Sequence, residues 1–201
     1  MEKGITHKKV QFRMTWTLYS LGIIPLSYMV SLIVVLLVHG AFGFNQMEEG
    51  TYLSQTVMQM AGGAALGLGT GLYQRSLLRK VFNISPSWIY SLMAGFAVTE
   101  LIVCLILWQL GINRSELRFI ESNPVPEALF FAGAGLITGL FQWFLLKKHF
   151  SGSIIWVIAS TLAWGICILV TLLSVWAFFL GALLYGAITE AALCWIIHGK
   201  K

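Results

Sequence analysis

The chain has 201 residues, of which 58% are hydrophobic and only 10% are charged, and its mean hydropathy is +0.81. This composition excludes an ordinary soluble domain and is typical of an integral membrane protein. The formal net charge is +5; we attribute it to a basic cytoplasmic face beside anionic lipid, not to binding of nucleic acid.

Six apolar runs are each long enough to cross a bilayer core as a helix, which takes about 20 residues. They cover residues 15–38, 56–74, 88–110, 128–146, 154–174 and 177–197. The sequence therefore predicts an all-α polytopic membrane protein, a single transmembrane domain over residues 1–201 with six transmembrane helices. We expect residues 1–13 to be a short polar arm and Pro25 to kink the first helix.

The basic residues predict the orientation. Eleven of the thirteen Lys and Arg residues lie before the first run or after the second, fourth and sixth, and only Arg114 and Arg118 lie in the opposite loops. Because cytoplasmic loops carry the excess of positive charge, we expect both termini to be cytoplasmic.

An internal repeat organises the middle of the chain, where residues 64–88 recur at 132–156 without a gap. Each copy is an apolar helix with small residues, one glutamine, a basic stop and a tryptophan that opens the next helix. The identical pairs include Gly67 and Gly135, Thr70 and Thr138, Gly71 and Gly139, Gln74 and Gln142, and Trp88 and Trp156. The last run offers a weaker third copy with Ala182, Gly186, Thr189 and Glu190.

Because the second and fourth helices run in the same direction, the repeat is predicted to be parallel, with three helical hairpins around an axis along the membrane normal. Small residues four apart let helices approach closely. We assign this helix-packing role to Gly63, Gly67, Gly71, Gly135, Gly139 and Gly186. The alternative is that these small faces line a central path.

Two glutamates lie inside apolar runs, Glu100 in the third and Glu190 in the sixth. An ionised acid at that depth costs about 2.5–3.5 kcal/mol, and the apolar runs hold no Lys or Arg to neutralise it. Each acid follows a threonine, which supplies a local hydroxyl. The acids are either protonated and hydrogen-bonded, or exposed to a water-filled cavity, or ligands of a cation or cationic substrate.

Gln74 and Gln142 are the repeated polar side chains and complete the set of candidate intramembrane functional residues with the two acids. They either cross-link helices or form a polar gate at the inner mouth. The sequence carries no catalytic motif and no dinucleotide or phosphate fingerprint. We therefore expect no catalytic residue, no cofactor and no metal, and a protein that is not an enzyme.

The pattern Gly-x-x-Gln-aromatic-x-x-Leu-basic stands at Gly139 to Lys147, and a partial copy that lacks the aromatic residue stands at Gly71 to Arg79. With the tryptophan that follows, it resembles a group of small bacterial multi-pass proteins with such repeats, over roughly residues 60–165. The resemblance implies the bacterial plasma membrane as the location. It implies no specific activity.

Two functions follow as hypotheses. The first is a small transporter or permease-like bundle that uses Glu100 and Glu190. The second is a non-catalytic accessory, sensor or partner-binding subunit, which contacts another membrane protein through its small-residue stripes, its outer loop 112–127 or its basic face. A membrane enzyme that acts on lipids is a third, weaker alternative. Transport predicts loss of function in Glu100→Gln, whereas an accessory role predicts tolerance of that change.

Overall fold

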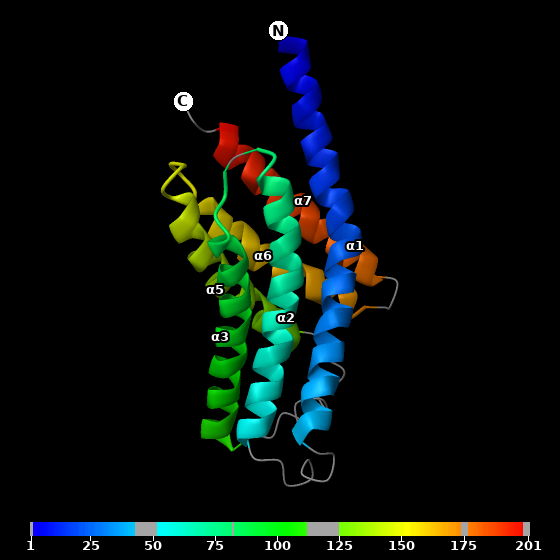
Figure 1. Ribbon diagram of the computed structural model, residues 1–201, viewed down its shortest axis with the longest axis vertical. Helices are drawn as coiled ribbons and strands as arrows, with labels where there is room; N and C mark the ends of the chain where they lie inside the picture. The colour runs from blue at the N-terminus through cyan, green and yellow to red at the C-terminus, as the bar shows by residue number, and fades with distance from the viewer. Residues whose placement is uncertain (1, 43–51, 82, 112–124, 174–176, 199–201) are drawn as a thin grey trace.

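In a computed structural model the chain is all-helical, and no strand occurs among the residues that it describes, 2–42, 52–81, 83–111, 125–173 and 177–198. Figure 1 shows the helices, which are α1 (Glu2–Phe42), α2 (Tyr52–Leu78), α3 (Ser87–Leu110), α5 (Val125–Leu146), α6 (Ile155–Thr171) and α7 (Ala177–His198). Most of the outer loop 112–127, which the sequence nominates for partner contact, lies outside the described residues.

The first helix differs from its prediction. It begins at Glu2, so the expected polar arm is helical, and Pro25, where we expect a kink, lies inside it. Residues 2–13 contain no proline, and extending an existing helix by one residue costs far less than starting a new one. The apolar run that follows therefore carries the helix into the polar segment.

Among the described residues, four helices are long and apolar enough to cross a membrane. They are Thr15–Ala41, Ser87–Leu110, Val125–Leu146 and Ala177–Ile197. The two other predicted spans correspond to α2 and α6. Helix α6 has only 17 residues, and the glycines, threonines and glutamines of α2 lower its mean hydropathy.

The helices form a closed ring. Each packs against its neighbours along the chain, and α7 returns to pack against α1. Figure 1 shows the two termini at the same end of the molecule, together with the α2–α3 and α5–α6 connections. The ring thereby brings the first and last helices into contact, from Trp16 beside Thr189 to Tyr28 beside Phe178.

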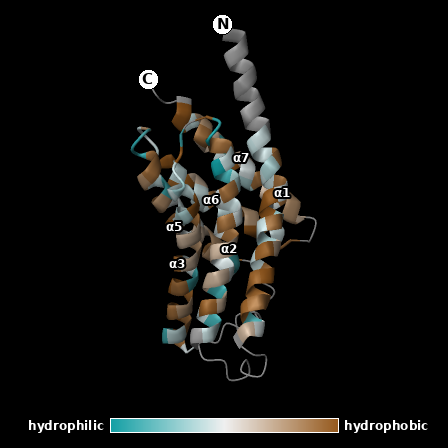
Figure 2. Cartoon of the chain, viewed as in Figure 1, coloured by the Kyte–Doolittle hydropathy of each residue, from teal (hydrophilic) through white to brown (hydrophobic). Residues whose placement is uncertain are grey.

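Large apolar side chains cover the outside of the ring. Leu37, Leu129 and Leu173 are each about two-thirds exposed or more, at 68%, 67% and 73%. Figure 2 shows hydrophobic residues along most of α1 and α3, and hydrophilic residues at the upper end of α2 and its connection to α3. Soluble proteins rarely expose so much contiguous apolar surface, so this exterior suits a lipid environment.

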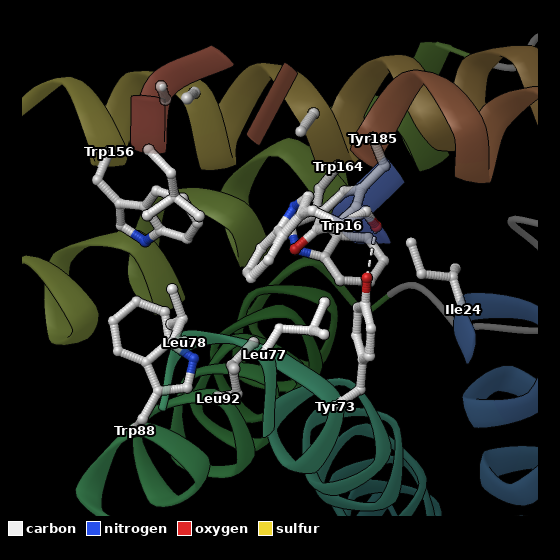
Figure 3. Packing of buried hydrophobic residues seen from close by; sticks show 14 of the residues in the cluster. Trp16, Ile24, Tyr73, Leu77, Leu78, Trp88, Leu92, Trp156, Trp164 and Tyr185 are labelled. Atoms are coloured by element: carbon white, nitrogen blue, oxygen red, sulfur yellow. Dashed lines mark hydrogen bonds between the residues drawn. The ribbon is translucent and has the colours of Figure 1, made fainter. Parts of the chain in front are cut away.

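Aromatic side chains fill the interior. Four tryptophans, Trp16, Trp88, Trp156 and Trp164, are at most 1% exposed. Figure 3 shows two groups of rings, with Trp88 and Trp156 in one and Trp16, Trp164 and Tyr185 in the other. Because a buried indole N–H usually finds a hydrogen-bond acceptor, polar side chains are expected beside these rings.

Candidate functional site

Gln74 of α2 and Gln142 of α5 meet in the interior of the ring. Nε2 of Gln142 donates a hydrogen bond to Oε1 of Gln74 over 3.2 Å. Nε2 of Gln74 donates in turn to the hydroxyl of Tyr185, from α7, over 2.7 Å. The exposed fractions of the two glutamines are 0% and 1%. Gln74 therefore joins α2, α5 and α7 through its side chain.

Each glutamine also accepts a hydrogen bond from the tryptophan that opens the next helix. Nε1 of Trp88 lies 3.0 Å from Oε1 of Gln74, and Nε1 of Trp156 lies 2.8 Å from Oε1 of Gln142. The two indole rings are 5.7 Å apart, so the two copies of the sequence repeat contact each other directly. We name the connected side chains of Gln74, Gln142, Trp88, Trp156 and Tyr185 the central network.

A third contact of this kind joins α7 to α1. Nε1 of Trp16 donates to Oγ1 of Thr189 over 2.9 Å, and Thr189 stands where the repeat has glutamine. The two helix backbones also approach each other closely here, as they do in the repeat. A Cβ atom at Gly186 would lie 2.9 Å from Cα of Thr17, the residue after Trp16. Gly139 faces Val157, the residue after Trp156, in the same way, at 3.1 Å.

Sequence reasoning missed this third contact because its tryptophan lies at the opposite end of the chain from its threonine. A signal was present. Trp16 and Ser20 have the same spacing as Trp156 and Ser160 in the second copy. Only closure of the ring reveals that α1 stands next to α7 as α6 stands next to α5.

The glycine stripes face the following helix and not the centre of the ring. A Cβ atom at Gly67 would lie 2.6 Å from the backbone of Leu92, and one at Gly71 would lie 3.0 Å from Cα of Ile89, both in α3. Gly135 likewise faces the backbone of Ser160 in α6. The alternative in which small faces line a central path therefore does not describe these glycines.

Glu100 lies at the contact between α3 and α2. Its side chain is 8% exposed, and its Cγ would lie 3.2 Å from a Cβ atom at Gly63, which keeps room for it. The neighbouring Thr99 does not turn toward the acid, because its hydroxyl donates to the carbonyl oxygen of Gly95. The local hydroxyl that the sequence offers to Glu100 is thus used within its own helix.

Glu190 lies at the contact between α7 and α1. It is half-buried, and Oε2 accepts a hydrogen bond from the hydroxyl of Thr17. The two acids do not share a site. Glu100 lies twelve residues beyond Trp88, or about 18 Å along a helix, whereas Glu190 adjoins the Trp16 contact, which is the counterpart of the Trp88 contact.

The arrangement is therefore one buried, hydrogen-bonded centre of neutral side chains, with Glu190 beside the equivalent Trp16–Thr189 contact and Glu100 further along the bundle. An unpaired buried amide or indole costs about 1–3 kcal/mol, so these contacts select one packing of the described helices. No protein-family model, curated protein or solved structure matches this chain.

Proposed function

We propose that all six helices span the membrane and that the termini lie on its cytoplasmic side. Helix α2 has 27 residues and so extends for about 40 Å, and α6 with 17 residues extends for about 26 Å, close to the thickness of a bilayer core. In the ring, α2 lies between α1 and α3, and α6 lies between α5 and α7, and all four neighbours are long and apolar. The basic residues after α2 and α5 lie toward the end that also carries the termini, which supports the orientation by the positive-inside rule.

We further propose that the bundle consists of three helical hairpins related by a parallel repeat, α2 with α3, α5 with α6, and α7 with α1. The first two follow the repeat in the sequence. The third is divided between the two ends of the chain, and its support is the Trp16–Thr189 hydrogen bond. The resemblance to small bacterial multi-pass proteins supports the plasma membrane as its location.

We infer that this bundle acts as a small permease for a polar solute. One observation carries the inference: among the residues that the structure describes, an exterior of exposed leucines encloses twelve buried polar or charged residues, including Glu100, Gln74 and Gln142. Burial of polar groups in a membrane is costly, and such residues commonly mark a path for a solute or an ion. A protein that serves only as an anchor has no need of them.

The second candidate is an accessory or sensor subunit without catalytic activity. The observation that favours it is the density of hydrogen bonds in the central network, where Gln74 alone joins three helices. A centre that is held in one arrangement suits a scaffold for a partner membrane protein better than it suits alternating access.

Accessibility of the cysteines to water distinguishes the two candidates. Cys104 is half-buried and lies one turn from Glu100, and Cys194 lies one turn from Glu190. Each is kept as the only cysteine and treated in intact membranes with a charged, membrane-impermeant thiol reagent. Permeation predicts labelling of at least one of them. The fully buried Cys167, kept alone, is the control that must stay unlabelled until the protein is unfolded.

If Cys104 and Cys194 react only after unfolding, both acids are packed away from water and the permease proposal is wrong. The accessory role then predicts that another membrane protein copurifies with the chain in mild detergent and that Glu100→Gln leaves this association intact.

A further inference from the structure

Arg75 carries a buried hydrogen-bond donor that the rest of the chain does not use. It lies in the last turn of α2, and its side chain is half-buried. Its Nε is buried and has no hydrogen-bond partner among the residues that the structure describes. The guanidinium is always charged, and an unpaired buried donor costs more when its group is charged. An acceptor from outside the chain would remove this cost.

The packing of α2 on α3 places Arg75 beside the start of α3. A Cβ atom at Gly67 would contact the backbone of Leu92, and one at Gly71 would lie 3.0 Å from Cα of Ile89. The two helices are therefore antiparallel, and each turn along α2 corresponds to one turn back along α3. Arg75 comes one turn after Gly71, so it is level with residues 85–86, which lead into α3.

Other groups that bind anions lie at the same place. The N–H of Arg79 donates to the carbonyl oxygen of Arg75 over 3.0 Å, so the two arginines share one face of the helix. Arg79 and Lys80 are exposed, as are Ser85 and Ser87, whose hydroxyl oxygens are 3.0 Å apart. Like charges four residues apart repel each other, and the positive end of the α3 dipole adds to this field. An anion between them would relieve the repulsion.

The second copy of the repeat resolves the same position differently. Trp143 stands where the first copy has Arg75, and Lys147 stands where it has Arg79. Nζ of Lys147 lies 4.9 Å from the centroid of the Trp143 ring and 4.2 Å from that of Phe144. The cation of the second copy thus has aromatic partners within its own chain, whereas Nε of Arg75 has no partner there.

Neither intramembrane acid lies at this point. Glu100 is thirteen residues beyond Ser87, or about 20 Å along α3. Glu190 bonds to α1, which packs on the side of α2 that carries Tyr73. Arg75 comes two residues after Tyr73 and so lies on the opposite side of α2. An anion beside Arg75 therefore meets no carboxylate from these two residues.

We propose that Arg75 and Arg79, at the start of α3, bind the phosphate of an anionic phospholipid. A guanidinium matches phosphate oxygens with two parallel hydrogen bonds. The surface next to the arginines is apolar, since Leu72 is 52% and Tyr90 is 66% exposed, and this surface suits acyl chains rather than free phosphate. Figure 2 shows the hydrophilic upper end of α2 adjoining it. The proposal rests on α2 and α3 spanning the membrane, and it does not require passage of a solute.

The test uses the full-length protein, freed of lipid in a neutral detergent. The thermal midpoint, Tm, is measured during titration with phosphatidylglycerol, and we expect a saturable rise. Phosphatidylcholine, whose choline would face the arginines, should raise Tm less. Arg75→Gln is expected to weaken the apparent affinity for phosphatidylglycerol about tenfold, the effect of one lost hydrogen bond to a charged group. Arg75→Lys keeps the charge but not the planar fork and should lie between Gln and wild type.

Lys147→Gln is the matched control from the second copy and should keep the affinity for phosphatidylglycerol. Native mass spectrometry gives a second readout, in which Arg75→Gln should retain one phosphatidylglycerol fewer than Lys147→Gln. Without lipid, Arg75→Gln should have the Tm of the wild type, because Nε of Arg75 has no partner in the chain. A lower Tm there would assign Arg75 to the fold and contradict the proposal.

The proposal is also wrong if Arg75→Gln and Lys147→Gln bind phosphatidylglycerol equally, or if inorganic phosphate raises Tm as much as the lipid does. Lipid nanodiscs separate this failure from that of the membrane-spanning proposal. A chain that inserts into them, with both variants binding equally, contradicts this site alone. A chain that does not insert contradicts both proposals.

Discussion

Replacing Gln74 with leucine is expected to lower the free energy of unfolding by about 2–4 kcal/mol, the largest effect of any single polar substitution in the bundle. The substitution removes the acceptor of Trp88 and of Gln142 and the donor to Tyr185. These partners stay buried, so each loses its hydrogen bond without gaining one to water. Equilibrium unfolding in mixed detergent micelles, followed by tryptophan fluorescence, measures the loss.

Gln59→Leu is the matched control, because Gln59 belongs to the same helix and is only half-buried. It should change the free energy of unfolding by less than about 0.5 kcal/mol. Gln142→Leu should lie between the two, since it removes the bonds to Trp156 and Gln74 only. Equal effects of Gln59→Leu and Gln74→Leu would mean that the central network does not stabilise the fold.

Gly135→Ala is expected to destabilise the protein by about 1–3 kcal/mol, because the new methyl group has no room. Its Cβ would collide with the carbonyl oxygen of Ser160 and lie 2.9 Å from Cα of Thr161. These are backbone atoms of α6, so the two helices must move apart. The same unfolding measurement applies.

Gly133→Ala separates this collision from the effect of alanine on the helix itself. Gly133 lies in α5 as well, and a Cβ atom there meets nothing within 4 Å. Alanine is a better helix former than glycine by about 1 kcal/mol, so this variant should be as stable as the wild type or more stable. If Gly133→Ala and Gly135→Ala had the same free energy of unfolding, the close backbone contact of α5 with α6 would not exist.

The contact of α7 with α1 in the divided hairpin has an equivalent close approach at Gly186. Gly186→Ala would place a methyl group 2.9 Å from Cα of Thr17 and 2.9 Å from Cβ of Ser20. If α7 and α1 pack as α5 and α6 do, its loss of stability should approach that of Gly135→Ala. Gly22→Ala in α1, where nothing lies within 4 Å, should have no such effect.

The sequence by itself determined the class of the protein and most of its helices. Apolar runs of helical length predict α3, α5 and α7 to within a few residues, because in a membrane each segment must satisfy its own backbone hydrogen bonds. The repeat identified Gln74 and Gln142 as the polar pair of interest. The sequence did not predict that residues 2–13, expected only to be a polar arm, continue the first helix.

Only the tertiary structure decided which residues meet. The direct bond between Gln74 and Gln142, the participation of Tyr185 and the contact of Trp16 with Thr189 all join segments that are far apart in the chain. Periodicity specifies which face of a helix is small or polar, but it does not specify the neighbour that this face meets. Closure of the six helices into a ring makes that choice, because it sets the first helix beside the last and turns each glycine stripe toward the helix that follows it.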